Sequence, residues 1–78
     1  MAPPPAPVRE YVVQHEVPSV AIDREVVVGQ PLPETVELYP VPRYERYEYA
    51  TVNNRTTIVD PYTRRVVDVM PAAEEIIR

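Results

Sequence analysis

The segment Val52–Met70, VNNRTTIVDPYTRRVVDVM, decides the fold, because two of its apolar runs are separated by residues that favour tight turns. Asn53-Asn54 suits a hairpin turn, since asparagine tolerates left-handed backbone conformations. Asp60-Pro61 suits a type I turn, which favours aspartate first and proline second. The flanking valine, isoleucine and threonine residues favour strands. The segment therefore predicts a three-stranded antiparallel meander, with strands over residues 47–52, 56–60 and 64–70.

Two further extended runs precede the meander. Ser19–Gly29 is rich in β-branched residues, and the only glycine ends it, at a position that favours a positive φ or a close backbone approach. Thr35–Tyr39 alternates between two faces, as a strand does. The prolines around these runs belong at sheet edges and in loops. We therefore expect an all-β domain over residues 11–70, a small sheet of four or five strands that ends in the meander.

The two ends of the chain have a different composition. Residues 1–10, MAPPPAPVRE, predict a proline-rich, disordered and solvated tail of polyproline II type. Tyr11–Gln14 is compatible with a short strand or a helical turn. Residues 71–78, PAAEEIIR, predict either a short helical segment, the minor α content of the fold, or a frayed tail.

Length and composition exclude several classes of function. The 78 residues include no lysine and no cysteine, which excludes lysine Schiff-base chemistry, thiol catalysis and thiolate metal sites. A single glycine excludes a glycine-rich phosphate loop. We expect no enzyme activity and no cofactor. A core of about 60 residues is marginal in isolation, so self-association as a homodimer is a reasonable expectation.

The charge and hydropathy of the chain argue against two kinds of partner, nucleic acid and the membrane interior. The net charge of −4 opposes the basic field that nucleic acid requires, so we expect no nucleic-acid binding. No run approaches the ~20 apolar residues of a spanning helix, so we expect no membrane insertion.

One cluster of tyrosine and arginine residues suggests a binding surface. These are the residue types enriched at interface hot spots, so the cluster predicts a protein-binding patch. The alternative is that the tyrosines are partly buried packing residues with polar tips. The cluster comprises Tyr39, Arg43, Tyr44, Arg46, Tyr47 and Tyr49.

Two other features carry weaker hypotheses. His15 is the only histidine, and its neighbours Glu10, Glu16 and Asp23 form a poor ligand set for zinc or nickel, so we assign no metal site. The arginines that follow the Asp-Pro turn, Arg64-Arg65, are expected to pair with Asp60 or Asp68.

The stretches VVVGQPLPETVELYPVP and YEYATVNNRTTIVDPYTRRVVDV together resemble an uncharacterised bacterial family, domain of unknown function twelve thirty-six. The resemblance covers Tyr11 to about Met70, and its more specific half is Val52–Val67. It implies a small, exported alphaproteobacterial protein with low-complexity linkers and no established activity. The closing meander is more distantly similar to small periplasmic proteins of nickel and cobalt homeostasis.

These observations predict a non-enzymatic bacterial envelope module that binds another protein or itself. The alternatives are an accessory protein of periplasmic nickel or cobalt homeostasis, and a structural spacer without a specific ligand. The resemblance implies a periplasmic location. The start of the sequence, where no export signal is recognisable, leaves a cytoplasmic location as the alternative.

Overall fold

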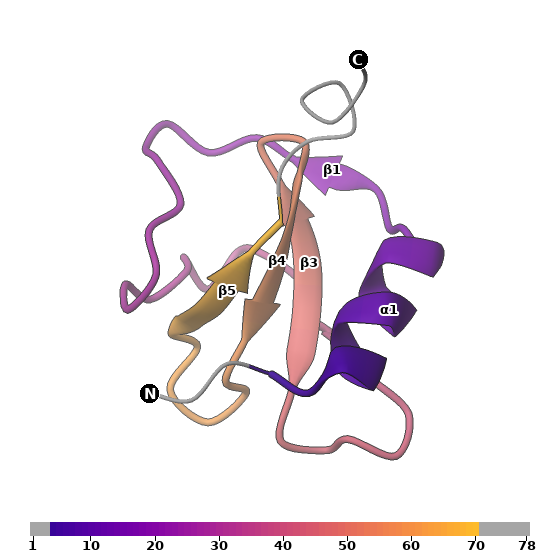
Figure 1. The fold of residues 1–78 in the computed structure, drawn as a ribbon. Helices are drawn as coiled ribbons and strands as arrows, with labels where there is room; N and C mark the ends of the chain where they lie inside the picture. The colour runs from indigo at the N-terminus through magenta and orange to yellow at the C-terminus, as the bar shows by residue number, and fades with distance from the viewer. Residues whose placement is uncertain (1–3, 71–78) are drawn as a thin grey trace.

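The computed structural model describes residues 4–70 and consists of one helix and one five-stranded sheet (Figure 1). The prediction of an all-β domain with a closing three-stranded meander is confirmed. No helix in this part of the chain is long and apolar enough to cross a membrane. The expected C-terminal helical turn lies outside the described residues. In chain order the elements are α1 (Ala6–Gln14), β1 (Ser19–Val20), β2 (Tyr39–Pro40), β3 (Glu48–Val52), β4 (Arg55–Val59) and β5 (Val66–Val69).

The hairpin between β3 and β4 has the turn that its asparagines predict. Val52 pairs with Arg55, so two residues form the loop. Asn53 and Asn54 have φ values of 53° and 67°, both in the left-handed region. Two consecutive positive φ angles define a type I′ turn, whose twist matches that of the flanking strands. The Asn-Asn prediction is therefore confirmed.

The side chain of Asn53 fastens a distant segment to this turn. Its Oδ1 accepts a hydrogen bond from the N–H of Ile22 at 2.9 Å, and its Nδ2 donates to the carbonyl of Arg24 at 3.1 Å. Its backbone N–H donates to the carbonyl of Val20 at 2.9 Å. One residue thus closes the hairpin and fixes the chain that leaves β1.

The connection from β4 to β5 is wider than a simple type I turn. Asp60 begins it as expected, because its Oδ1 accepts the N–H of Tyr62 at 2.8 Å. However, the carbonyl of Asp60 accepts the N–H of Arg64, four residues on, at 2.7 Å, and Arg64 has a φ of 60°. A β-bulge follows, because Val59 pairs with Val66 whereas Ile58 pairs with Asp68. The extra residue changes the register of the last strand.

Strand β3 lies at the centre of the sheet, with β4 along one edge and two short strands sharing the other. β1 pairs with its C-terminal half in parallel, and β2 pairs with its N-terminal half antiparallel. The expected strands over 19–29 and 35–39 are therefore wrong in extent, since only the two residues of β1 and the two of β2 belong to the sheet. Pro40 lies on this edge, where a missing N–H does least harm.

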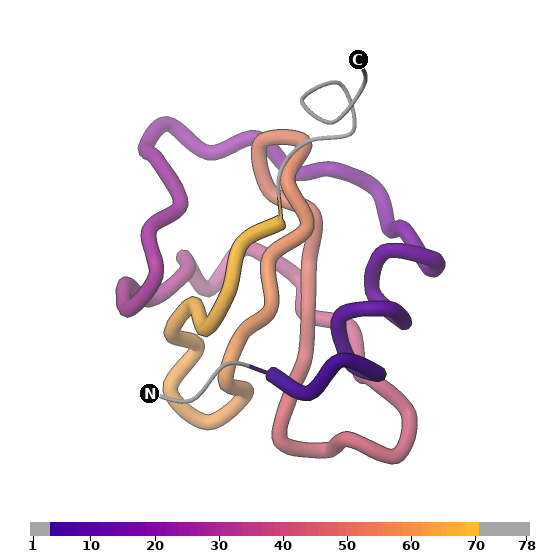
Figure 2. The backbone as a smooth tube through the Cα atoms, in the orientation of Figure 1, coloured from indigo at the N-terminus to yellow at the C-terminus, as the bar shows by residue number. Residues whose placement is uncertain are grey.

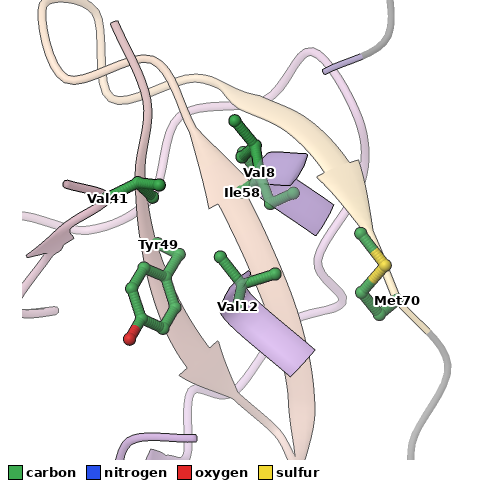
Figure 3. Close-up of a cluster of buried hydrophobic side chains, with 6 residues drawn as sticks. All are labelled: Val8, Val12, Val41, Tyr49, Ile58 and Met70. Atoms are coloured by element: carbon green, nitrogen blue, oxygen red, sulfur yellow. The ribbon is translucent and has the colours of Figure 1, made fainter. Parts of the chain in front are cut away.

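Both faces of the sheet are covered, and each has its own core. Helix α1 covers one face, and the long segment 21–38 passes across the other (Figure 2). Alternation along β3 and β4 sends Tyr49 and Ile58 toward the helix and Ala50 and Val59 away from it. The helix-side cluster, shown in Figure 3, consists of Val8, Val12, Val41, Tyr49, Ile58 and Met70. The opposite cluster consists of Leu32, Val36, Ala50, Val52, Val59 and Val66.

Helix α1 corrects the expectation for the N-terminal region. The predicted disordered tail over residues 1–10 is wrong from Ala6 onward, because the helix begins there. Pro7 lies in the first turn, where a missing N–H costs nothing. Val8 and Val12 are fully buried, and their spacing of four places both on the face toward the sheet. Burial of this apolar stripe holds the helix in place.

Two arginines hold the long segment against β5. Nη2 of Arg64 donates to the carbonyls of Pro33 and Val36, each at 2.7 Å, and Nη1 of Arg65 donates to the carbonyl of Gly29 at 2.8 Å. The expected pairing of these arginines with Asp60 or Asp68 is therefore wrong. Gly29 has a φ of 93°, so the first of the two expected reasons for the only glycine, a positive φ, applies there.

Candidate functional site

The connection between β2 and β3, residues 41–47, makes two tight turns in succession. The N–H of Tyr44 donates to the carbonyl of Val41, and the N–H of Tyr47 donates to the carbonyl of Tyr44, each at 3.0 Å. Pro42 is at the second position of the first turn, and Arg43 follows it with a φ of 71°. Proline followed by a positive φ is the pattern of a type II turn. The loop lies beside the N-terminal end of α1 (Figures 1 and 2).

The structure divides the six residues of the tyrosine and arginine cluster into two groups. Four of them, Arg43, Tyr44, Arg46 and Tyr47, lie together on loop 41–47. The two arginines are exposed, whereas the two tyrosines are half-buried and pack against the helix-side cluster. They line a groove of about 460 Å³. This 43–47 groove is lined by Pro5, Arg43, Tyr44, Glu45, Arg46 and Tyr47.

The other two residues of that cluster lie on strands: Tyr49, on β3, is part of the buried core, and Tyr39, on β2, packs against it. Tyr49 is 3% exposed, and its hydroxyl donates to the carbonyl of His15 at 2.7 Å. Its ring meets that of Tyr11 edge to face, with centroids 6.0 Å apart, and lies 6.1 Å from that of Tyr39. Burial raises the pKa of Tyr49, and the neighbouring Tyr11 and Tyr39 add to the increase. The packing alternative therefore describes these two tyrosines, and in part Tyr44 and Tyr47, which also pack against the helix-side cluster.

His15 ends the helix. Its ring stacks on that of Tyr11 with centroids 4.0 Å apart, its Nδ1 lies 3.0 Å from the Tyr11 carbonyl, and its side chain is exposed. Its carbonyl accepts the Tyr49 hydroxyl, as described above. Within residues 4–70, no three histidine, cysteine or acidic side chains gather where they could hold a metal ion. The contacts of His15 are those of a helix cap.

The sequence does not indicate Pro5 as part of the groove, because the composition of residues 1–10 predicts a solvated tail. Pro5 caps the start of α1, and the docking of the helix brings it to loop 41–47. The signal that predicts this is the pair of valines at positions 8 and 12, four residues apart. An apolar stripe on a helix implies a surface that covers it, and thus a fixed place for the residue before the helix.

A second hollow, more apolar, lies along the outer side of α1. It measures about 390 Å³, and Val13 on its wall is 55% exposed. This helix groove is lined by Ala6, Arg9, Glu10, Val13, Gln14 and Met70. Next to it, Nε of Arg9 lies 3.4 Å from Oδ2 of Asp68, so an ion pair joins the helix to β5.

Comparison with known proteins places the chain in a family. Residues 11–71 match the model of the domain of unknown function DUF1236, so the chain belongs to that family. This confirms the resemblance carried by the proline-bounded runs and the Val52–Val67 motif. No curated protein and no solved structure matches the chain.

Proposed function

We propose that this chain is a non-enzymatic module of the bacterial envelope that binds another protein through the 43–47 groove. The observation that carries the proposal is the composition of the groove, in which two exposed arginines alternate in sequence with two half-buried tyrosines. Side chains held by packing lose little rotamer freedom on binding, so tyrosines of this kind make good anchors. The envelope location follows from the exported character that the family resemblance implies.

The exposure of the charged groups in the groove supports a binding role over a catalytic one. Arg43, Glu45 and Arg46 are all exposed to solvent. General acid–base catalysis requires a carboxyl group whose pocket shifts its pKa toward the working pH. Exposed charges at the rim of a groove instead steer a partner and set its orientation.

Addition of a partner strand at a sheet edge is less favoured than binding at the groove. The N–H and carbonyl of Val66 bond to Gln30 and Gly29, so this part of the outer edge of β5 is occupied. The N–H of Val69 is covered by Oδ1 of Asp68 at 2.9 Å. β1 and β2 offer only two residues each. A partner strand would find few free groups.

The test is capture from envelope extract of the source bacterium, with immobilised wild-type protein and two variants. Arg43→Asn combined with Arg46→Gln removes both charges, and asparagine tolerates the positive φ of residue 43. Arg24→Ala is the control, because Arg24 is also exposed and does not line the groove. We expect one or more proteins to bind the wild type and Arg24→Ala but not the double variant. Equal capture by all three would remove the groove as the binding surface.

Self-association is a second candidate, favoured by the helix groove. Val13 is exposed at 55% on a largely apolar wall, and a second copy is one way to cover such a surface. Val13→Glu is expected to lower the mass in solution if copies meet there. Val27→Glu is the matched control, since Val27 is 48% exposed on the segment that covers the opposite face. A monomeric mass for the wild type across a concentration series would end this candidate.

A further inference from the structure

Pro5 has the backbone conformation of polyproline II where it meets the 43–47 groove. Its φ of −60° and ψ of 153° lie close to the roughly −75° and +145° of that conformation. It lines the groove together with Tyr44 and Tyr47, and Pro4 before it is buried. A proline in extended form therefore already lies beside these tyrosines within the chain itself.

The groove offers what a proline-rich ligand needs. Polyproline II has no internal hydrogen bonds and is largely preformed, so its binding costs little conformational entropy. Aromatic-lined grooves recognise it through contact with its pyrrolidine rings. Tyr44 and Tyr47 present such rings, held by the turn between them and by their packing on the helix-side cluster.

The charge of the groove points to acidic residues in the ligand. Arg43 and Arg46 are exposed, and each precedes one of the tyrosines in sequence. Glu45 is the only acid among residues 41–47, so the loop carries a net positive charge. The whole chain has a net charge of −4, and the loop therefore differs in sign from the molecule around it. An arginine pairs best with a carboxylate that it can bind through two N–H groups.

We propose that the 43–47 groove binds a proline-rich segment of a partner protein in polyproline II conformation, with acidic residues placed beside Arg43 and Arg46. The ligand lies along Tyr44 and Tyr47 and continues the proline surface that Pro5 begins. This inference rests on the proposed function, because it specifies the partner class of the same groove.

Titration of the full-length, ¹⁵N-labelled protein with two synthetic peptides tests the inference. One peptide repeats Glu-Pro-Pro, and the other has the same charge with alanine in place of every proline. We expect the proline peptide to shift the amide signals of residues 43–47 and to bind at least about tenfold more tightly than the alanine peptide. Equal affinities, or shifts confined to another surface, would overturn the inference.

Two variants, one of them a double substitution, separate charge from fold. Arg43→Asn with Arg46→Gln is expected to weaken binding of the proline peptide, and Glu45→Gln to strengthen it, with melting temperatures unchanged because all three side chains are exposed. If neither peptide binds while capture from envelope extract still depends on the two arginines, the proline specificity is wrong and the proposed function stands. If that capture ignores the arginines, the proposed function itself fails.

Discussion

Asn53→Gly tests whether one amide side chain fastens the chain after β1 to the β3–β4 hairpin. The substitution removes the hydrogen bonds to the N–H of Ile22 and the carbonyl of Arg24. Asn54→Gly is the matched control, because Asn54 is the other residue of the same turn and its side chain is exposed. Both positions have a positive φ, 53° and 67°, which glycine adopts without strain.

The expected difference between the two variants follows from the lost bonds. Each hydrogen bond contributes about 0.5–1.5 kcal/mol to the free energy of unfolding, so the loss of two costs about 1–3 kcal/mol. The extra freedom of glycine in the unfolded chain is the same at both positions and cancels in the comparison. For a domain of this size, about 2 kcal/mol lowers the melting temperature by roughly 8–16 °C, so Asn53→Gly should melt that far below Asn54→Gly.

Thermal and urea unfolding followed by circular dichroism measure the effect in both variants. Amide exchange adds a local readout, because the N–H of Ile22 loses its acceptor in Asn53→Gly alone. Equal melting temperatures for the two variants would refute the reasoning. Such a result would mean that water replaces both partners of the Asn53 amide at no net cost.

Three other predictions concern the fastening of the helix and the long segment. Tyr49→Phe removes the hydroxyl bonded to His15 and should cost about 1 kcal/mol of unfolding free energy in urea titrations at neutral pH. Folding raises the pKa of Tyr49 above 10.0, so its neutral hydroxyl contributes to the free energy of unfolding below pH 10, and this contribution is lost as the pH rises through the raised pKa. The stability of Tyr49→Phe should therefore fall less steeply at alkaline pH than that of the wild type. Arg64→Ala should cost about 2–4 kcal/mol of unfolding free energy and speed amide exchange in residues 34–36; unchanged exchange there would contradict the role of its guanidinium. Arg9→Ala should change the free energy of unfolding by less than about 1 kcal/mol, since the side chains of Arg9 and Asp68 are 52% and 27% exposed.

The meander could be predicted from the sequence because its determinants are local. The Asn53-Asn54 pair and Asp60 shape turns within a few residues of their own positions. The position of each turn then sets which residues of the adjoining strands pair. The positive φ of Gly29 could be expected for the same reason, because it is a local property of one residue. The tyrosine and arginine cluster of residues 39–49 can be recognised by residue type, but its division into a loop group and the pair Tyr39 and Tyr49 depends on the fold.

The helix and the long segment could not be predicted in this way, because distant contacts override local preference there. Residues 6–14 contain β-branched valines and a proline, which weaken a helical pattern, yet burial of Val8 and Val12 on the sheet stabilises α1. Val27 and Val28 read as strand residues but remain exposed. Their segment is held instead by Arg64 and Arg65, whose side chains donate hydrogen bonds to carbonyls 28 to 36 residues away in the sequence.

The shared edge of β3 has a consequence for the order in which the molecule assembles. The β3–β4 hairpin joins neighbours in sequence, whereas β1 reaches its partner in β3 across 32 residues, from Ser19 to Thr51. Pairing across that separation must overcome a larger loop-closure entropy than pairing across a two-residue turn. We therefore expect the hairpin to be formed in the folding transition state, and β1, α1 and the long segment to join it afterwards. Mutations in the Asn53-Asn54 turn should then slow folding, whereas those in α1 should mainly speed unfolding.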